Sequence, residues 1–469
     1  MASTSDRPNI VLITSDQQRY DSLGCTGCAA AKTPHLDALA ARGTLFRQHY
    51  VTNPVCSPSR GSFMTGLYPN ESGLWANGCA LPEDRPTLAS TLSDAGYQTA
   101  HVGKLHLVPI LDRVAPHPAY GFEHLEVGEA DQMYPHDDHW NFLRRSDPLG
   151  YVDYMNELYK HGHAAGYTSA LPEPLHHSTW VTDRTLNWLS DTRTDDEPFF
   201  LNVGYFDPHH AFNPIEPWAS MFAEIDLPEP FHDPAVIDQR PDGYRKNYNY
   251  SRYLLQDPAT LPAIVRAYHA MIAHLDHCVG RLLAGLEDHG LANNTIVVFS
   301  SDHGEMLGSH GMLHKGGFLL DDLMRVPLIV AGPGQEPAVV DQLTSMIDLM
   351  RTFTEWAGCA NPSPHGRPLQ SVDHRPLPEG GHDAVFAQWE NHTVETADRS
   401  IRMVRTQRHK LITYAEPEVG ELYDLADDPL ETHNRFTDPG YVDTRAELSV
   451  MLDTRLDQAR PQTPAIVGW

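Results

Sequence analysis

Short apolar runs alternate with amphipathic stretches along most of the chain. The runs have the length and composition of buried strands, and the stretches between them carry apolar residues at helical spacing. This alternation is typical of an α/β fold, in which crossover helices connect the strands of a sheet. The strand-like runs are residues 8–16, 98–104, 197–206, 295–302 and 326–334, and the clearest helical stretches are residues 33–43, 87–97 and 264–290.

Two internal regions depart from this pattern. Residues 125–180 and 213–262 are rich in Pro, His, Asp and Tyr and show little periodicity. We expect them to be long loops with short helices, which in a compact domain often form lids or pocket walls.

The pattern also changes after about residue 370. Residues 403–414 and 420–428 have the pattern of two antiparallel strands, and a helix is expected near residues 441–458. We therefore predict a large domain of residues 1–370 and a small C-terminal α+β subdomain of residues 371–469 that contains an antiparallel sheet.

The chain is strongly acidic. Of its 469 residues, 34 are Lys or Arg and 62 are Asp or Glu, which gives a formal net charge of −28. Such a surface repels nucleic acid and anionic lipid, so we expect neither as a partner. No apolar run reaches the length of a membrane-spanning helix, and the N-terminal segment lacks the basic leader of a signal peptide. We therefore expect a cytoplasmic protein with free cysteine thiols.

Four of the predicted strands are followed directly by polar residues. Ligands bind outside the carboxyl ends of the strands in an open parallel sheet, so these residues would meet along one edge. Two carboxylates, an amide oxygen and an imidazole among them suit a divalent cation. The alternative is that each aspartate is an ordinary helix cap or turn residue. The residues are Asp16 and Gln17, Lys104 and His106, Asp207, His209 and His210, and Asp302 and His303.

The segment NPVCSPSRGSFMTG, residues 53–66, places a cysteine, a proline and an arginine within five positions. Pro58 suits the first turn of a helix, so Cys56 is expected just before that helix, where free N–H groups favour an anion. Arg60 would lie one turn away on the same face, able to hold an oxyanion or to orient the group at position 56. The alternative is a buried thiol beside an arginine that extends to water.

Several sequence blocks together resemble the type I sulfatases of the alkaline-phosphatase superfamily. The pattern C-x-P-S-R followed by T-G, present in CSPSRGSFMTG, is highly specific for that family. The resemblance covers nearly the whole chain and implies a large, mostly parallel sheet sandwiched by helices. It also implies a sulfuric ester hydrolase that cleaves an organic O-sulfate. The other blocks are GYQTAHVGKLH (96–106), DPHHAF (207–212), SDHGEMLGSHGMLHKGG (301–317) and ELYDLADDPLETHN (421–434).

The resemblance implies the chemistry of the site as well. Cys56 matches the cysteine that a separate formylglycine-generating enzyme converts to formylglycine, whose hydrated aldehyde is the nucleophile. One hydroxyl of the hydrate attacks sulfur and the other later expels sulfate, which divides a difficult reaction into two easier steps. The implied metal ligands are Asp16, Gln17, Asp302, His303 and residue 56. Arg60 would steady the hydrate, Lys104 and Lys315 would hold sulfate oxygens, His106 would assist the elimination, and His209 would protonate the leaving group.

The chain departs from many family members at two of the metal ligands. Gln17 stands where a second aspartate is usual, and His303 stands where an asparagine is usual. Calcium is still the expected ion, with manganese or magnesium as alternatives. The same pair of ligands resembles phosphonate monoester hydrolases, so a phosphonate monoester or phosphodiester hydrolase is the alternative function. Those relatives tend to lack the lysine and histidine of the GKLH block. A third hypothesis is an inactive relative that binds a sulfated ligand.

The organic part of the substrate stays open between a sugar, a choline-like cation and an aryl ring. Aromatic and polar loop residues are candidates to contact it, although packing within the loops explains them equally well. We expect His310 and His314 either to support the residues that contact the metal or to have structural roles. The apolar tail 464–469 is a candidate contact in a homo-oligomer, and the alternative is that it covers the C-terminal sheet. The loop residues are Trp75, Asn77, His136, His139, Trp140, His176 and His177.

Overall fold

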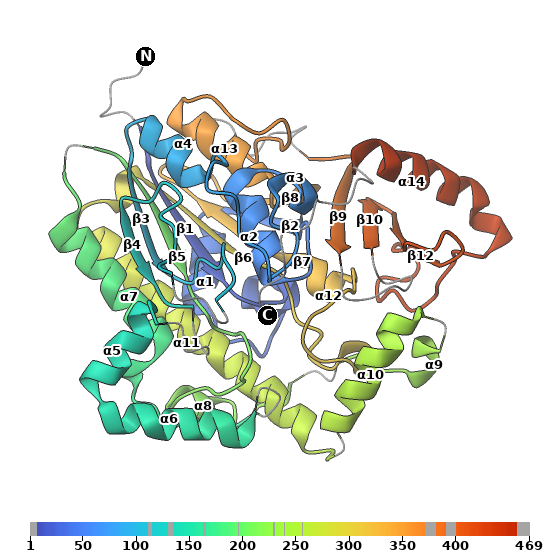
Figure 1. Ribbon diagram of the computed structural model, residues 1–469, viewed down its shortest axis with the longest axis horizontal. Helices are drawn as coiled ribbons and strands as arrows, with labels where there is room; N and C mark the ends of the chain where they lie inside the picture. Colours follow the sequence, from blue (N-terminus) through green and yellow to red (C-terminus); the bar gives the residue numbers. More distant parts are fainter. Residues whose placement is uncertain are drawn as a thin grey trace.

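The structure is a computed structural model in which a large α/β body carries a second, smaller sheet at one end (Figure 1). The tail 464–469 and the segment 371–380 lie outside the residues that it describes. Within the described part of the chain, no helix combines the length and apolar character needed to cross a membrane. The described residues are 7–110, 115–129, 135–162, 166–195, 197–227, 230–238, 240–255, 257–370, 381–390 and 400–456.

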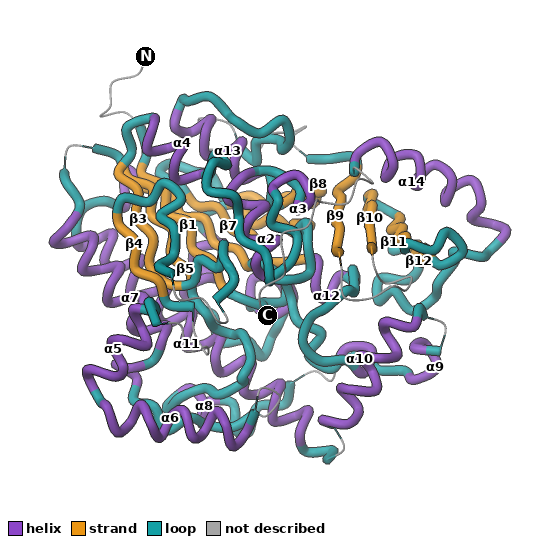
Figure 2. The backbone as a smooth tube through the Cα atoms, viewed as in Figure 1, coloured by secondary structure: helices purple, strands orange, loops and turns teal. Residues whose placement is uncertain are grey.

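The main sheet has eight strands in the order β4-β3-β5-β1-β6-β7-β2-β8 (Figure 2). Neighbouring strands pair in parallel except for β7, which is antiparallel to both β6 and β2. The predicted α/β fold with a mostly parallel sheet is therefore confirmed. The strands are β1 (Asn9–Ser15), β2 (Thr44–Tyr50), β3 (Gln98–Gly103), β4 (His124–Val127), β5 (Phe199–Gly204), β6 (Thr295–Ser301), β7 (Arg325–Ala331) and β8 (Ala338–Ser345).

Both faces of this sheet are covered by helices. Along β1, Ile10 and Leu12 lie in one apolar core and Val11 and Ile13 in the other, as the two-residue period of a strand requires. The strands are apolar throughout because both of their faces are buried. The first core includes α2 (Cys56–Thr65), α4 (Leu88–Asp94) and α13 (Asp348–Ala357), and the second includes α1 (Pro34–Ala41), α7 (His177–Asn187) and α11 (Thr260–Asp288).

The two regions expected to be loops contain longer helices than predicted. The expectation of short helices was wrong for α6 (Pro148–His161) and α10 (Asp242–Leu254), which have 14 and 13 residues. Asp147 caps the first turn of α6, and its tyrosines pack on a small apolar cluster. Tyrosine gives a weak apolar signal in a sequence, so this packing face was overlooked. The other helices of these regions are α5 (Asp138–Ser146), α8 (Trp218–Met221) and α9 (Pro234–Ile237).

The C-terminal part forms a separate antiparallel sheet in the order β12-β11-β10-β9, covered by α14 (Val442–Arg455). Residues 403–414 were expected to be one strand, which is wrong, because Gln407 and Arg408 turn the chain between β10 and β11. Alternation continues on both sides of this two-residue turn, so the sequence looks like a single strand. The division at residue 370 stays a prediction. The strands are β9 (Ala384–Glu390), β10 (Ser400–Thr406), β11 (His409–Thr413) and β12 (Gly420–Asp424).

Buried charged side chains connect this second sheet to the main body. Lys410 of β11 is fully buried, and its Nζ lies 2.5 Å from a carboxylate oxygen of Asp321, in the short helix α12 (Asp321–Met324), and 2.6 Å from one of Glu431. Arg240, which follows α9, donates a hydrogen bond of 2.9 Å to Glu421 of β12. Ion pairs therefore hold the two parts together in addition to apolar contacts. One further short helix, α3 (Pro69–Ser72), follows α2.

Candidate active site

Four neighbouring strands, β3, β5, β1 and β6, run in parallel and end at one edge of the main sheet (Figure 2). The loops that follow them meet there, as the sequence pattern predicted. Asp16 and Gln17 follow β1, Lys104 and His106 follow β3, Asp207 and His209 follow β5, and Asp302 and His303 follow β6.

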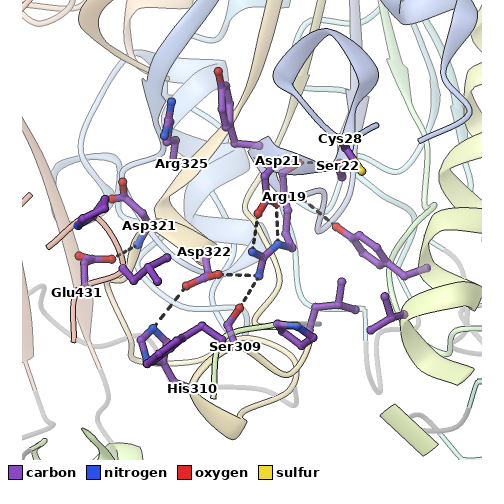
Figure 3. A pocket seen from close by; sticks show the side chains of 18 of the residues that line it. Arg19, Asp21, Ser22, Cys28, Ser309, His310, Asp321, Asp322, Arg325 and Glu431 are labelled. Carbon is purple, nitrogen blue, oxygen red and sulfur yellow. Dashed lines mark hydrogen bonds and ion pairs between the residues drawn. The ribbon is translucent and has the colours of Figure 1, made fainter. Parts of the chain in front are cut away.

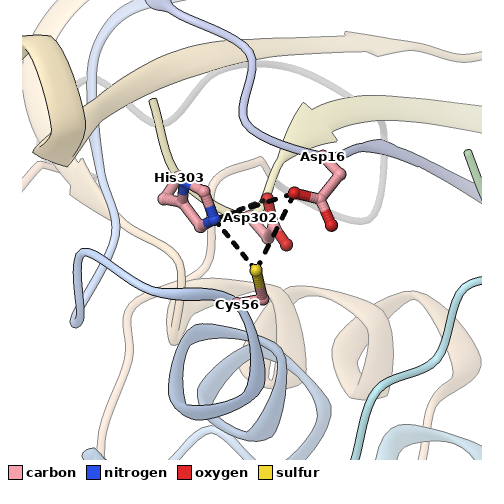
Figure 4. A group of neighbouring side chains, drawn as sticks. All are labelled: Asp16, Cys56, Asp302 and His303. Atoms are coloured by element: carbon pink, nitrogen blue, oxygen red, sulfur yellow. Dashed lines mark hydrogen bonds and ion pairs between the residues drawn. The ribbon is translucent and has the colours of Figure 1, made fainter. Parts of the chain in front are cut away.

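Cys56 faces this edge from the start of α2. It is the first residue of the helix rather than the residue before it, because Val55 is the last residue with an extended backbone. The Asn77 side chain accepts a hydrogen bond of 3.1 Å from the Ser57 N–H and so caps the helix. The buried Cys56 Sγ lies 3.2 Å from His303 Nε2 and 3.8 Å from Asp16 Oδ1 (Figure 4).

Arg60 is buried one turn further along α2, so the alternative in which it extends to water is wrong. Its Nε donates to Asp302 Oδ2 at 2.8 Å, and a terminal nitrogen lies 3.3 Å from Asp16 Oδ2. The other terminal nitrogen donates to the Lys104 carbonyl at 2.8 Å. The guanidinium therefore joins the loops that follow β1, β3 and β6.

Two lysines face the same group of side chains. Lys104 Nζ lies 2.6 Å from Asp16 Oδ2. Lys315, from the loop after β6, places its Nζ 2.8 Å from Cys56 Sγ and 3.1 Å from His303 Nε2. Two positive charges thus lie close to residue 56 and Asp16, in an otherwise acidic protein.

The burial of these groups alters their protonation. Burial alone would raise the pKa of the Asp16 carboxyl, but Lys104, His209 and Lys315 hold it well below its usual range. Burial, with Asp16 nearby, raises the pKa of the Cys56 thiol to about 11. The thiol is therefore protonated at neutral pH, and an unmodified cysteine is a weak nucleophile here.

The donor set beside Cys56 fits a divalent cation. Candidate ligand atoms of Asp16, Cys56, Asp302 and His303 all lie within 4.8 Å of one another, and all four residues are buried. His303 Nδ1 is 2.7 Å from the Gly304 carbonyl, and donation there leaves the Nε2 lone pair for a metal. Among the residues that the structure describes, the buried Gln17 Oε1 atom has no hydrogen-bond partner, which suits a ligand that a cation would satisfy.

Two buried glutamates support the site and were missed by the sequence analysis. Glu305 accepts hydrogen bonds from the Gln17 side-chain amide and from the backbone N–H groups of Leu307 and His314. Glu129 accepts a bond of 2.8 Å from the backbone N–H of His106. Glu305 lies in the quoted SDHGEM block and could have been noticed there, whereas nothing in the sequence around Glu129 indicates its role.

The predicted histidines lie around the same edge. The His106 Nδ1 atom is buried without a hydrogen-bond partner, and burial, with Lys104 nearby, lowers its pKa well below the usual value. Burial and Lys315 likewise lower the pKa of His209, whose Nδ1 contacts the His210 carbonyl. His314 stacks on His210 with ring centroids 4.1 Å apart, which fits the structural role expected for it.

Most loop residues considered as substrate contacts are buried instead. Trp75, His139 and Trp140 are each less than 5% exposed, and His176 and His177 less than 10%. They pack inside the protein, as the alternative interpretation expected. Of the remaining two, Asn77 caps α2 and His136 is exposed.

A cavity of about 600 Å³ lies behind the Gln17 loop and is lined partly by Arg19, Asp322 and His310 (Figure 3). Arg19 forms ion pairs of 2.8 Å with Asp21 and 2.7 Å with Asp322, so its charge is compensated inside the cavity wall. Arg19 also donates to the Glu305 carbonyl at 3.0 Å. This wall of the cavity therefore holds the loop that carries Glu305.

Comparison with known proteins identifies the family. The family model for sulfatases matches residues 8–359, which is most of the chain. The chain belongs to the sulfatase family. It is therefore a hydrolase that acts on sulfate esters, and the resemblance of its sequence blocks is confirmed. A second family model, described as N-sulphoglucosamine sulphohydrolase, C-terminal, matches residues 308–460 of this sulfatase.

Similar proteins carry names for several substrates. The arylsulfatase of Clostridium perfringens is 29% identical, with 93% of this chain and 91% of the relative covered. The choline-sulfatase of Rhizobium meliloti is 28% identical, with 96% of this chain and 87% of the relative covered. A solved structure of the phosphonate monoester hydrolase of Agrobacterium radiobacter matches this sulfatase with a TM-score of 0.83 and 26% identity, covering 96% of this chain and 97% of that chain.

Proposed function

We propose that this sulfatase cleaves the O–S bond of a small organic sulfate, with Cys56 converted to formylglycine and one divalent cation bound beside it. The position of the Cys56 Sγ atom carries the proposal. It lies at the N-terminus of α2, 2.8 Å from Lys315 Nζ, 3.2 Å from His303 Nε2 and 3.8 Å from Asp16 Oδ1. An atom at this position faces a candidate cation site and a fixed positive charge together.

Asp16, Gln17, Asp302 and His303 would hold the cation, together with residue 56. When bound, the cation would polarise a sulfate oxygen and lower the pKa of the nucleophilic hydroxyl. Three of the four donors are oxygens, which favours calcium, while the imidazole of His303 keeps manganese and magnesium as alternatives.

The protein's own cations would bind and orient the sulfate group. Lys104, beside Asp16, and Lys315, beside residue 56, would neutralise sulfate oxygens that gain charge in the transition state. Each of the three guanidinium nitrogens of Arg60 contacts a protein oxygen, of Asp302, Asp16 or the Lys104 carbonyl, so it would act by fixing these groups in place. This refines its expected role, which was to steady the hydrate directly.

Two histidines would move the protons. The unpartnered Nδ1 of His106 is a candidate acceptor for a proton from residue 56, whose hydrated aldehyde offers two hydroxyl groups. His209 would protonate the departing alkoxide. Its Nδ1 contacts the His210 carbonyl, so the proton for the leaving group would come from Nε2. A bound sulfate adds negative charge nearby and would favour the protonated ring.

The proposed modification is tested by mass spectrometry of a peptide that spans residues 48–60. Conversion of Cys56 to formylglycine lowers the peptide mass by about 18 Da. The protein should be produced in a host that contains the formylglycine-generating enzyme, the proposed maturation partner. An unmodified peptide from protein that hydrolyses sulfate esters at full rate would overturn the proposal.

A matched variant separates chemistry from folding. Cys56→Ala should lose at least about a thousandfold in turnover, because the covalent step has no nucleophile. Its melting temperature should stay close to that of the unaltered protein, since one buried thiol is replaced by a smaller apolar group. Residual turnover near the original rate would show that residue 56 does not react.

Phosphonate monoester hydrolysis is the second candidate. The Gln17 and His303 ligands and the match to a phosphonate monoester hydrolase favour it, whereas Lys104 and His106 of the GKLH block favour sulfate. Turnover of an aryl sulfate and the matching aryl phosphonate distinguishes them: sulfate should be preferred, and a phosphonate preference of several orders of magnitude would reverse the assignment. A panel of sulfated sugars, choline sulfate and aryl sulfates would then define the organic group.

A further inference from the structure

A second group of possible metal ligands lies in the core, outside the set assigned to the cation. His176 precedes α7, Asp207 follows β5, and His274 lies in the middle of α11. All three are buried, and their ligand atoms lie within 4.8 Å of one another. Figure 1 shows how α7 and α11 pass together under the ends of the strands.

The Asp207 carboxylate is buried with few compensating groups. Ser178 donates a hydrogen bond of 2.8 Å to its Oδ2 atom. Its ion-pair partners among the described residues are His176 Nδ1 at 3.9 Å and His274 Nδ1 at 3.8 Å. Both distances exceed a hydrogen bond. A buried carboxylate in this situation requires a cation, or else must hold a proton.

The two imidazoles place their Nδ1 atoms beside this carboxylate. His176 Nδ1 accepts a hydrogen bond of 3.2 Å from the Ser178 N–H, so this nitrogen carries no proton. His274 Nε2 lies 3.2 Å from Thr179 Oγ1, and donation there leaves its Nδ1 unprotonated as well. The His176 Nδ1 lone pair is engaged by the Ser178 N–H, whereas the His274 Nδ1 lone pair and the carboxylate oxygen repel each other unless a positive charge lies between them.

The space beside the group suits a water ligand of one ion. A cavity of about 20 Å³ is lined by His176 and Asp207 and by two further histidines, His139 and His177. Those two histidines contact carbonyl oxygens through Nε2, both at 2.9 Å, and their buried Nδ1 atoms have no hydrogen-bond partner among the described residues. Apolar side chains line the cavity as well, and His274 does not, so the cavity has room for one water ligand beside the ion rather than for the ion itself.

We propose that His176, Asp207 and His274 bind a second, structural divalent metal ion, with zinc preferred. Two imidazoles and one carboxylate are a common zinc ligand set, and a water molecule in the cavity would complete a tetrahedron. Each ligand atom lies about 2.0–2.1 Å from zinc, so ligand atoms of one ion are roughly 3 to 4 Å apart, close to the spacing here. The long Ser178 capping bond to His176 would yield to the ion.

An ion at this site would hold a loop in place and would take no part in the reaction. The Asp207 carbonyl accepts a hydrogen bond of 3.3 Å from the Asp16 N–H, and His209 follows two residues later. An ion held by Asp207 would therefore fix the loop after β5 to α7 and α11. It would stabilise the position of His209 without contacting the substrate.

The test is the metal content of the full-length protein, measured by mass spectrometry after dialysis against zinc-free buffer. The expected result is one zinc per chain in the unaltered protein and in Asp302→Asn, which alters only the cation site beside Cys56. His274→Gln and His176→Gln should lose this zinc, while the matched control His139→Gln, which lines the same cavity, should keep it. Zinc absent from the unaltered protein, or retained in full by His274→Gln, would overturn the proposal.

A second measurement uses the unaltered protein, so it tests the site even where a variant fails to fold. Zinc-depleted, unaltered protein should take up one equivalent of cobalt(II) with the visible absorption of a tetrahedral site, and Asp302→Asn should give the same spectrum. Absence of this absorption rejects the site, whatever the variants do. Both readouts are independent of turnover, so they can fail without the proposed sulfatase mechanism failing, and the reverse also holds.

Discussion

Glu305 would supply a negative charge next to the neutral ligand that we propose at position 17. Gln17 supplies an amide where many relatives supply a carboxylate, but Glu305 accepts a hydrogen bond from that amide and is itself fully buried. The contact fixes the amide so that Oε1, which has no partner, can face the proposed cation. Glu305 thus places a carboxylate one hydrogen bond away from the Gln17 amide, which itself has no charge.

Glu305→Gln should weaken calcium binding by about 10- to 100-fold, because the amide of Gln17 loses both its anchor and the neighbouring charge. Calorimetric titration of cation-free protein measures this. The double variant Gln17→Glu with Glu305→Gln moves the charge onto the ligand and should recover most of the affinity. Glu224→Gln, an exposed change of the same kind, is the control, and equal affinity in all four proteins would contradict this view of Glu305.

The sequence identified the residues of the site that belong to continuous patterns. Asp16, Asp302 and Cys56 stand out because each follows an apolar strand or lies in a specific motif. The role of Glu305 depends on a side chain 288 positions earlier in the chain, and no local pattern reports such a contact. The roles of the site residues remain predictions for the experiments above.

At the scale of elements, the ends of β3 and β5 approach unusually closely. The Lys104 N–H donates to the Gly204 carbonyl at 2.8 Å. Gly103 has a φ angle of +105°, and a Cβ atom there would lie 2.0 Å from the Gly204 oxygen. Glycine at the end of β3 therefore permits the turn that directs Lys104 toward Asp16.

Gly103→Ala should lower the free energy of unfolding by about 3 kcal/mol or more, because backbone strain and a backbone clash add together. Gly27→Ala is a close control, since its φ angle is +107° and a Cβ atom there would have nothing within 4 Å. The control should lose only about 1 kcal/mol, from strain alone. Urea unfolding measures both, and equal losses would show that the clash is relieved elsewhere.

Elements with a strong single period were predicted well, and those with a mixed signal were not. The central strands are apolar because both faces are covered, so β1, β3, β5 and β6 were recognisable. The helix α6 carries its apolar face on two tyrosines, one methionine and one leucine, and the β10–β11 turn interrupts no pattern. In both cases the structure depends on contacts with neighbouring parts of the fold, and a short stretch of sequence does not show those contacts.

At the scale of the whole molecule, a buried lysine of the C-terminal sheet forms ion pairs that join this sheet to the main body. Lys410 of β11 lies between Asp321 and Glu431 with no solvent exposure, and it also donates to the Leu319 carbonyl at 3.2 Å. Removing this lysine would leave the two carboxylates without their shared cation, with only the Tyr50 hydroxyl donating to Asp321 and the Asp321 N–H donating to Glu431 among the described residues.

Lys410→Met should therefore cost about 3 to 5 kcal/mol of folding free energy, although the new side chain has a similar length. Denaturant unfolding at neutral pH is the measurement. Lys160→Met, at the exposed end of α6, should change stability by less than about 0.5 kcal/mol. A similarly small change at residue 410 would mean that its two acidic partners are already neutral.

The ion pair of Lys410 also limits how far the protein can be shortened. Asp321 belongs to the stretch of chain that leads on from Lys315, and it sits within the region matched by the sulfatase family model, whereas Lys410 comes from beyond it. A fragment cut near residue 370 would retain every proposed catalytic group and yet expose this acidic anchor. The chain beyond residue 370 therefore supports the reaction centre, and a shortened version of the protein should retain it.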